Sequence, residues 1–356
     1  MNRLPQLTLA ALATAVMLAA CGKKEEAAPA ATEAAAPAAD TAAAAPVACG
    51  KVTVASMNWQ SAEVLAQIDR LILSEGYGCE VEIVPGDTMP TLTSMMEKGQ
   101  PDVAPEAWIN AVRQPLDAAV KEGRLHYAAE SLKDGGVEGI WMPKYIADAN
   151  PEIKTIEDAL KHPELFPSAE NKDKGALHNC PSGWNCQITT GNAFKAWGAA
   201  DNGFVLVDTG SAAGLDGSIA KAYERKEGWL GYYWAPTSIL GKYEMVKLDA
   251  GVPHNKEAWE NCNSKQECTE PVKSDWARAE VYTVVTDRFK NEGGAAYEYL
   301  AARGWGNDTV NALLAWMSDN QATGEDGAKH FLKNQPDVWK AWVSADAAQK
   351  IEASLQ

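Results

Sequence analysis

The sequence predicts an α/β fold with parallel sheets, and the alternation of strand and helix patterns carries this prediction. Strand-like runs at 51–55 and 80–84 are each followed by apolar side chains at helical spacing, at 61–73 and 88–98. A glycine ends each helical segment: Gly76 and Gly99. Because a β-α-β-α order brings consecutive strands together through right-handed crossovers, we expect the chain to open with a parallel sheet.

The same alternation continues along the chain. Further strands are expected at 101–104, 137–142, 175–179, 204–207, 229–233, 244–248 and 279–286. Helices are expected at 155–160, 189–197 and 211–226, and several more follow residue 295. The stretch between the last two strands is interpreted as an insertion. Four tryptophans within or beside the C-terminal helical patterns are interpreted as packing residues: Trp305, Trp316, Trp339 and Trp342.

The N-terminus has the pattern of a lipoprotein signal. Residues 1–20 combine Arg3 with an apolar run too short to span a bilayer, and small residues precede Cys21. Cleavage before Cys21 and lipid attachment to its thiol are expected. Residues 21–46 are rich in Ala, Pro, Glu and Thr and have no aromatic side chain, so they predict a disordered tether. A periplasmic, membrane-anchored protein is therefore expected.

The charge balance narrows the range of partners. The formal net charge is −16, and loss of Arg3 with the signal would make it −17. An acidic protein favours neither nucleic acid nor anionic lipid surfaces, whereas small cations remain suitable ligands.

Six cysteines remain after Cys21, and an even number in an exported chain predicts disulfides. Local spacing favours three pairs: Cys49 with Cys79, Cys180 with Cys186, and Cys262 with Cys268. The first pair precedes two strands that would align it if they are parallel neighbours. A metal site is the alternative, but no CxxC pair occurs and the five histidines are scattered, so no metal is expected.

Four tryptophans follow predicted strands at a similar position: Trp59, Trp108, Trp184 and Trp234. Open α/β sheets bind ligands at the carboxyl ends of their strands. Core tryptophans have no reason to prefer that position, although packing of Trp234 beneath a loop remains an alternative. The shared position predicts an aromatic box, which is typical of sites for quaternary ammonium groups because ring faces attract a cation that has no N–H to donate.

Polar groups beside these tryptophans suggest how a ligand would be oriented. Glu106 lies two residues before Trp108 in an extended segment, so we expect it near the cation or accepting a hydrogen bond from a hydroxyl or N-oxide. A solvated carboxylate is the alternative. The loop 180–186 leads into a helix, whose first N–H groups are suited to a carboxylate.

Four strings resemble the glycine betaine, proline betaine and choline binding proteins of ABC importers. They are VTVASMNWQSAE, PDVAPEAWIN, CPSGWNCQ and GYYWAPTSILGKYE, and the resemblance spans residues 50 to 345. It implies a two-lobed periplasmic-binding-protein fold of type II, with a hinge, mostly parallel sheets and flanking helices. It further implies a monomer that delivers its ligand to an ABC permease and its ATPase.

The resemblance also implies roles for particular residues. Trp59, Trp108, Trp184 and Trp234 correspond to cage walls, and Trp141 falls near a further aromatic wall of some members. Relatives that bind carboxylated betaines commonly have histidine or proline near these tryptophans, which this chain lacks after Trp108. By the same resemblance, the backbone N–H groups of two residues are expected to be available for that role here: Asn185 and Cys186. One lobe is expected from 47–143 plus 239–356 and the other from 144–238.

The expected function is capture of a methylated ammonium osmolyte such as glycine betaine, proline betaine, choline, carnitine or trimethylamine N-oxide. The alternative is a sugar- or peptide-binding protein that uses tryptophan stacking, which would demand more polar side chains near the rings. A hydrolase is not expected, because the sequence contains neither GxSxG nor HExxH. No cofactor is expected.

Overall fold

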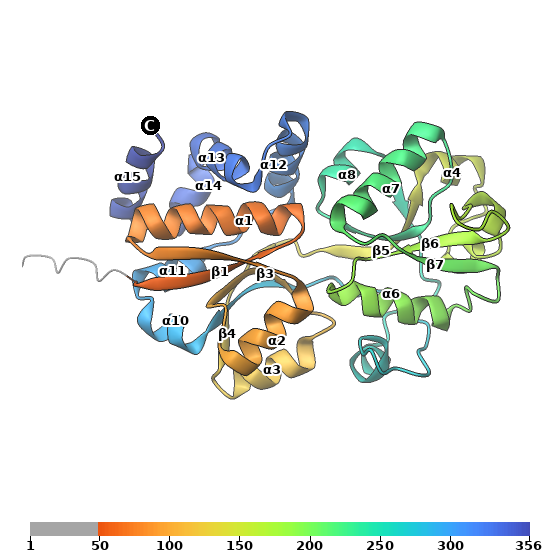
Figure 1. Cartoon of the computed structure of the whole chain (residues 1–356), viewed down its shortest axis with the longest axis horizontal. Helices are drawn as coiled ribbons and strands as arrows, with labels where there is room; N and C mark the ends of the chain where they lie inside the picture. Colours follow the sequence, from red (N-terminus) through yellow and green to blue (C-terminus); the bar gives the residue numbers. More distant parts are fainter. Residues whose placement is uncertain (1–48) are drawn as a thin grey trace, which may run out of the picture. The chain divides into compact units, whose positions relative to one another are not determined.

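This computed structural model describes residues 49–356, which form two five-stranded sheets with flanking helices (Figure 1). The expected signal segment 1–20, the lipidation site Cys21 and the whole of the expected tether 21–46 lie outside the described residues. Each sheet contains parallel and antiparallel pairs, so the fold is a mixed α/β fold.

The first sheet has the strand order β2-β1-β3-β10-β4. Its strands are β1 (Lys51–Met57), β2 (Glu80–Gly86), β3 (Val103–Trp108), β4 (Leu125–Glu130) and β10 (Val281–Thr286). The parallel pairing expected for the opening strands is confirmed, since β1 runs parallel to β2 and β3. β10 returns from the C-terminal part of the chain and runs antiparallel to β3 and β4.

The second sheet has the order β7-β6-β8-β5-β9. Its strands are β5 (Val137–Pro143), β6 (Gly175–Asn179), β7 (Phe204–Asp208), β8 (Gly231–Ala235) and β9 (Met245–Lys247). β6 is parallel to β7 and β8, whereas β5 is antiparallel to β8 and β9. β5 and β9 thus belong to this sheet, although the expected lobe limits, 47–143 plus 239–356 against 144–238, assign both strands to the other lobe.

Helices cover both faces of the sheets. The longer helices are α1 (Gln60–Leu71), α2 (Thr88–Lys98), α3 (Arg113–Lys121), α6 (Asn185–Ala196), α7 (Ala212–Arg225), α11 (Ala295–Ala302), α12 (Asn307–Asn320), α13 (Gly324–Asn334) and α15 (Ala345–Ser354). The shorter helical segments are α4 (Lys144–Ala149), α5 (Ile156–Ala159), α8 (Ser238–Lys242), α9 (Lys256–Ala258), α10 (Asp287–Glu292) and α14 (Pro336–Trp339). In Figure 1, α1 lies on one face of the first sheet and α2 and α3 lie on the other.

Apolar spacing and end signals explain the two opening helices. The buried face of α1 includes Val64, Leu65 and Ile68, which recur at helical spacing. α2 ends at Gly99, whose φ of 65° is the left-handed conformation that glycine adopts without steric cost. The predicted end of α1 at Gly76 is confirmed as the end of a π-helical turn over Ile72–Gly76 that continues the helix.

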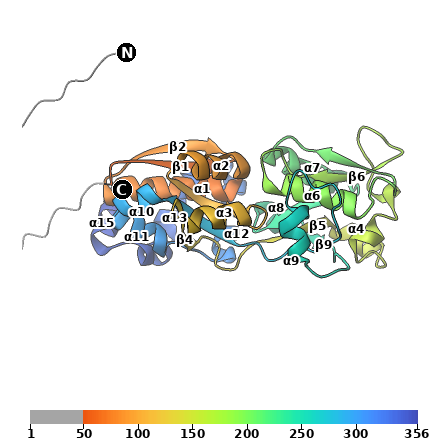
Figure 2. The same ribbon diagram turned by 90° about the horizontal axis from the view of Figure 1, so that it is seen from below.

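The segment between β9 and β10, which includes the α9 helix labelled in Figure 2, packs against α6 through the helical turn Trp259–Asn263. The Asn192 side chain on α6 donates hydrogen bonds to the carbonyl oxygens of Asn263 and Lys265, at 3.0 and 2.9 Å. This segment contains the disulfide between Cys262 and Cys268.

The three expected cysteine pairs are joined in the structure. The Cα atoms of Cys49 and Cys79 are 5.1 Å apart, beside the parallel pairing of Lys51 with Glu80. The Cα separations of the other two pairs are 6.0 Å for Cys180–Cys186 and 4.8 Å for Cys262–Cys268.

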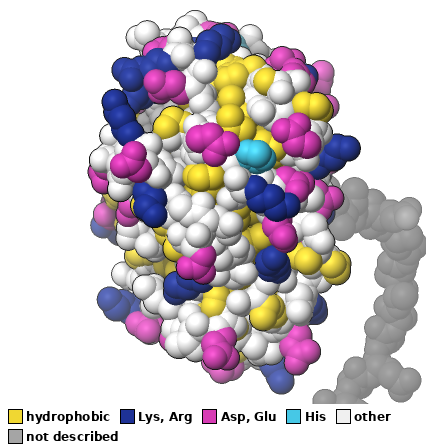
Figure 3. Space-filling model, turned by 90° about the vertical axis from the view of Figure 1, so that its right-hand side faces the viewer, with side chains coloured by type: hydrophobic (Ala, Val, Ile, Leu, Met, Phe, Trp, Pro, Cys, Tyr) yellow, Lys and Arg dark blue, Asp and Glu magenta, His cyan; other side chains and the backbone are white. Residues whose placement is uncertain are grey.

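The C-terminal tryptophans pack as expected. Trp305, Trp339 and Trp342 are buried, and Trp316 stacks on His330 with ring centroids 3.7 Å apart. Acidic and basic side chains are interspersed on the face drawn in Figure 3. Within residues 49–356, no helix combines the length and the apolar character that crossing a bilayer requires.

Candidate functional site

A pocket with about 290 Å³ of empty volume brings the four predicted tryptophans together. Its lining residues are Trp59, Thr88, Trp108, Glu138, Trp184, Asn185, Cys186, Tyr232 and Trp234. They come from segments that follow or belong to strands of both sheets. Six of the eight ligand-binding residues expected from the sequence therefore meet in one place.

Local structure places three of the four tryptophans at the start or end of an element. Trp59 is the N-cap residue of α1, two residues after β1, and Trp108 is the last residue of β3. Trp184 is the N-cap residue of α6, inside the loop that Cys180 and Cys186 close. Trp234 lies within β8 and not after it, because β8 begins at Gly231, two residues later than predicted.

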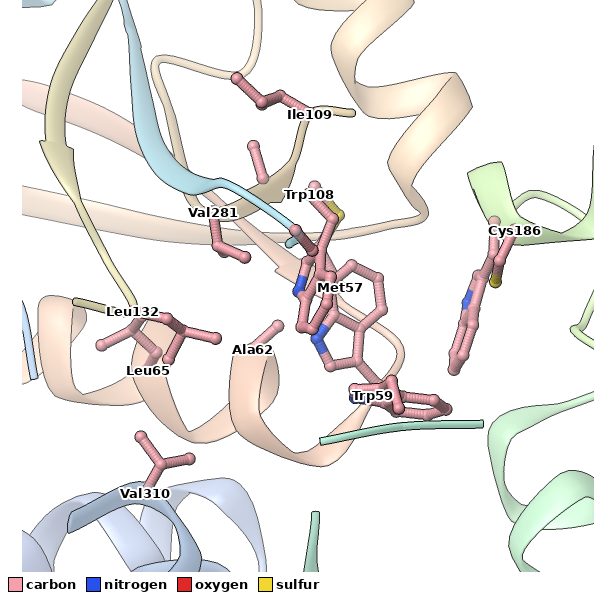
Figure 4. Packing of buried hydrophobic residues seen from close by; sticks show 14 of the residues in the cluster. Met57, Trp59, Ala62, Leu65, Trp108, Ile109, Leu132, Cys186, Val281 and Val310 are labelled. Atoms are coloured by element: carbon pink, nitrogen blue, oxygen red, sulfur yellow. The ribbon is translucent and has the colours of Figure 1, made fainter. Parts of the chain in front are cut away.

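The rings of three tryptophans form successive perpendicular contacts. The ring centroids of Trp59 and Trp184 are 5.3 Å apart with an interplanar angle of 74°. Those of Trp184 and Trp234 are 5.2 Å apart with an angle of 80°. Figure 4 shows Trp59 and Trp108 grouped together, with Cys186 facing them from another part of the ribbon.

Glu106 supports two of these rings from behind and does not line the pocket. Its Oε1 atom accepts hydrogen bonds from Trp59 Nε1 at 2.7 Å, Trp108 Nε1 at 3.0 Å and Ser61 Oγ at 2.8 Å. The side chain is fully buried. The alternative of a solvated carboxylate is therefore wrong, because the indole N–H groups of the two tryptophans enclose it.

Burial raises the pKa of Glu106, and the three donors together with the Arg303 guanidinium oppose that rise. Arg303 is itself buried and pairs with Asp69 of α1, Nε to Oδ1, at 2.9 Å. Its Nη2 also donates to the carbonyl oxygen of Pro105 and to Thr283. This network fixes the part of β3 that carries Glu106.

Glu138 and Tyr232 line the pocket, although neither was predicted as a site residue. Glu138 of β5 lies directly opposite Trp234 in the β5–β8 register and is 7% exposed. The Tyr232 hydroxyl donates to Glu138 Oε1 at 2.6 Å. Burial raises the pKa of Glu138 to about 7, against the opposing effects of Tyr232 and Lys247.

Two hydrogen bonds connect the segments that hold opposite walls of the pocket. Trp184 Nε1 donates to Asn58 Oδ1, and Asn185 Nδ2 donates to the carbonyl oxygen of Trp108 at 2.8 Å. The side chain of Asn185 thus holds the segments together, while Asn185 and Cys186 are the first residues of α6.

Trp141 lies outside this pocket. It is half-buried on β5 and pairs with Gly231 and Lys247 in the neighbouring strands. Successive side chains of a strand point to opposite faces, and Trp141 is three positions beyond Glu138, so the two side chains leave opposite faces of the sheet. Among residues 49–356, no cluster of three or more His, Cys, Asp or Glu is arranged to hold a metal ion.

Residues 50–334 match the model of the OpuAC family, the substrate binding domain of ABC-type glycine betaine transport systems. This match covers most of the chain.

Solved structures share the fold at low sequence identity. The glycine betaine, L-proline binding protein (ProX) from Borrelia burgdorferi is 18% identical, with a TM-score of 0.66 over 85% of this chain and 99% of that chain. Lactococcal OpuAC, in a closed complex with glycine betaine, is 19% identical, with a TM-score of 0.63 over 83% and 100%. A choline binding protein in complex with choline is 17% identical, with a TM-score of 0.68 over 86% and 99%. The shared fold is the type II fold of periplasmic binding proteins.

Proposed function

The chain belongs to the OpuAC family of substrate-binding domains of ABC-type transport systems, and from this premise we propose that it captures a methylated ammonium solute in the tryptophan-lined pocket. The candidate ligands are glycine betaine, proline betaine, choline, carnitine and trimethylamine N-oxide. Members of this family are solute-binding proteins of transporters, which fits a role in binding and not in catalysis.

The observation that carries this proposal is the convergence of four indole rings on one pocket whose described lining includes neither Lys nor Arg. The faces of aromatic rings attract a cation, and a quaternary ammonium group needs no hydrogen-bond acceptor. Four rings at roughly 0.5–2 kcal/mol each supply about 2–8 kcal/mol. The upper end of that range corresponds to roughly micromolar affinity.

The positions of the wall residues support a ligand enclosed from two sides. Trp59 and Trp108 follow or end strands of the first sheet, whereas Trp184 and Trp234 belong to segments of the second. We propose that two lobes, one built around each sheet, close around the ligand, with β5 and β9 in the lobe of the second sheet. If the ligand carries a carboxylate, the backbone N–H groups of Asn185 and Cys186 at the start of α6 would receive it.

The proposed cellular setting follows from the sequence at the N-terminus. Lipid at Cys21 would anchor a monomer to the membrane through the 21–46 tether, on the periplasmic side. There it would deliver its ligand to an ABC permease driven by its ATPase.

Isothermal titration calorimetry with the five candidate ligands tests the proposal. At least one should bind with a Kd below about 100 µM, which corresponds to more than about 5 kcal/mol. Trp184→Ala should weaken that binding at least tenfold, because Trp184 contacts both Trp59 and Trp234. Trp316→Ala, which alters an aromatic pair with His330 on the C-terminal helices, is the matched control and should bind normally.

No heat of binding for any of the five ligands would refute the proposal. A thermal-shift screen with sugars and short peptides on the same protein would then test the stacking alternative.

A further inference from the structure

We propose that Glu138, held by Tyr232, makes this pocket select a quaternary ammonium alcohol with net positive charge over a zwitterionic, carboxylated betaine. The inference rests on the proposed function and names the substrate class within it. Glu138 is a buried carboxylate in the wall of a pocket whose other walls are mainly aromatic.

The geometry leaves one carboxylate oxygen of Glu138 available to a ligand. Among the described residues, Tyr232 is the hydrogen-bond donor to this carboxylate, and its hydroxyl binds Oε1. Within residues 49–356, the Oε2 atom accepts no hydrogen bond and is not fully buried. Glu138 also lines the pocket. Oε2 is therefore placed to accept a hydrogen bond from a ligand hydroxyl.

Because Glu138 lies opposite Trp234, its Oε2 atom would be near a cation bound against the Trp234 ring. Glu138 and Trp234 are paired in the register of β5 and β8, and both line the pocket. Directly opposed residues on an antiparallel pair have Cβ atoms about 4.5–5.5 Å apart. An ammonium group against the Trp234 ring would therefore lie close enough to Glu138 for a favourable charge interaction.

The surrounding charges favour the same ligand class. A second carboxylate, Glu106, is buried behind Trp59 and Trp108. The charged or titratable groups that act on Glu138 from the neighbouring strands are Tyr232 on β8 and Lys247 on β9. Lys247 does not line the pocket, and its ammonium group lies 3.5 Å from Asp275 Oδ1.

A carboxylated betaine would bring a second anion into this pocket. Burying two carboxylates near each other is unfavourable unless one of them takes up a proton. A quaternary ammonium alcohol brings no anion, and its hydroxyl can donate to Glu138 Oε2. The same pocket therefore favours the alcohol and disfavours the carboxylate.

The proposal predicts opposite pH dependences for the two ligands. A net cation favours ionised Glu138, whose pKa burial raises to about 7, so the affinity for it rises between pH 6 and pH 8. A carboxylated zwitterion favours protonated Glu138, so the affinity for it falls over the same range.

Calorimetry with choline and glycine betaine, at pH 6 and pH 8, tests this assignment. The proteins are the wild type, Glu138→Gln, and Glu82→Gln, an exposed glutamate on β2 that serves as the control. At pH 8 the wild type should bind choline at least tenfold more tightly than glycine betaine. Glu138→Gln should reduce that ratio at least tenfold, and Glu82→Gln should leave it unchanged.

A wild-type preference for choline of less than tenfold would overturn the selectivity while leaving the proposed function intact. So would a Glu138→Gln variant that reduces this preference by less than tenfold. If Glu138→Gln fails to fold, the wild-type pH dependence decides, and choline affinity that does not rise from pH 6 to pH 8 overturns the assignment. Failure of both ligands together with trimethylamine N-oxide, carnitine and proline betaine would overturn the proposed function and this inference with it.

Discussion

Trp59 donates its indole N–H to Glu106 at 2.7 Å, although 47 residues separate the two in the chain. The same oxygen of Glu106 accepts the indole N–H of Trp108. One buried carboxylate thus fixes the orientation of two walls of the pocket. In the proposed function, Glu106 acts on a ligand through these rings, as a positioning residue.

Replacing Glu106 should therefore loosen the pocket. Glu106→Ala leaves the Trp59, Trp108 and Ser61 donors without their shared acceptor. Each buried donor without an acceptor destabilises the folded state by about 1–3 kcal/mol, and water that enters the space offsets part of this loss. We expect the free energy of unfolding to fall by at least about 2 kcal/mol and ligand affinity to fall at least tenfold. Urea denaturation and calorimetry measure the two effects.

Glu106→Gln separates orientation from charge, because its amide oxygen can still accept the indole N–H groups. This variant should keep ligand affinity within about threefold of the wild type, since one oxygen makes all three hydrogen bonds. Ser61→Ala, which removes one donor and leaves both rings bonded, is the second control. Equal losses in the Gln and Ala variants would contradict the positioning role.

Glu138 should make the ligand-free protein less stable as pH rises. Its folded-state pKa of about 7 lies above the ordinary value of 4.5, so the folded state holds a proton that the unfolded state has already lost. Stability is therefore lost as pH rises between these values, by up to about 3 kcal/mol. Asp216 accepts a hydrogen bond from the Tyr233 hydroxyl, and burial raises its pKa to about 6. It therefore also lowers the stability of the folded state as pH rises.

Urea denaturation of wild type and Glu138→Gln at pH 5, 6, 7 and 8 isolates this contribution. The Gln variant should gain stability relative to the wild type as pH rises, by about 2–3 kcal/mol over the range. Glu82→Gln should show no such trend. A stability difference that stays constant from pH 5 to pH 8 would show that Glu138 titrates normally.

The sequence was sufficient to predict the tryptophans of the pocket because their signal is local. Trp59, Trp108 and Trp184 each stand at the boundary of a strand or helix, and such boundaries are visible in apolar spacing, cysteines and glycines. The disulfides were predictable for a similar reason. Cys49 and Cys79 precede neighbouring parallel strands, and the other pairs close short loops.

The remaining site residues depend on tertiary pairing. Glu138 enters the pocket because β5 runs antiparallel beside β8, an arrangement that no spacing within 137–142 reveals. Strand β4 was not predicted, because its sequence, LHYAAE, has little β-branched character and is stabilised by its neighbour β10. Glu106 was predicted as a site residue, but its burial behind two rings follows from the meeting of α1 and β3.

The hydrogen bond from Trp184 to Asn58 should contribute to affinity more than to folding. Asn58 is exposed, so Asn58→Ala removes one acceptor without opening a cavity. We expect ligand Kd to rise about three- to tenfold, in line with about 0.5–1.5 kcal/mol for one hydrogen bond. Calorimetry measures this, and Asn202→Ala, which removes a local hydrogen bond to Gly198, is the control. Unchanged affinity in Asn58→Ala would rule out the contribution.

Two disulfides of equal loop size allow a matched test of the loop that carries Trp184. Cys180–Cys186 and Cys262–Cys268 both join residues six positions apart, but Cys186 lines the pocket and the second pair does not. Closing a loop of this size stabilises a protein by roughly 2 kcal/mol, through loss of freedom in the unfolded chain.

The double variants Cys180→Ser/Cys186→Ser and Cys262→Ser/Cys268→Ser should therefore lose similar amounts of stability in urea denaturation. Only the first should weaken ligand binding, at least fivefold by calorimetry, because the loop that carries Trp184 is then no longer closed by a disulfide. Equal binding by the two double variants would mean that Trp184 keeps its position without the disulfide.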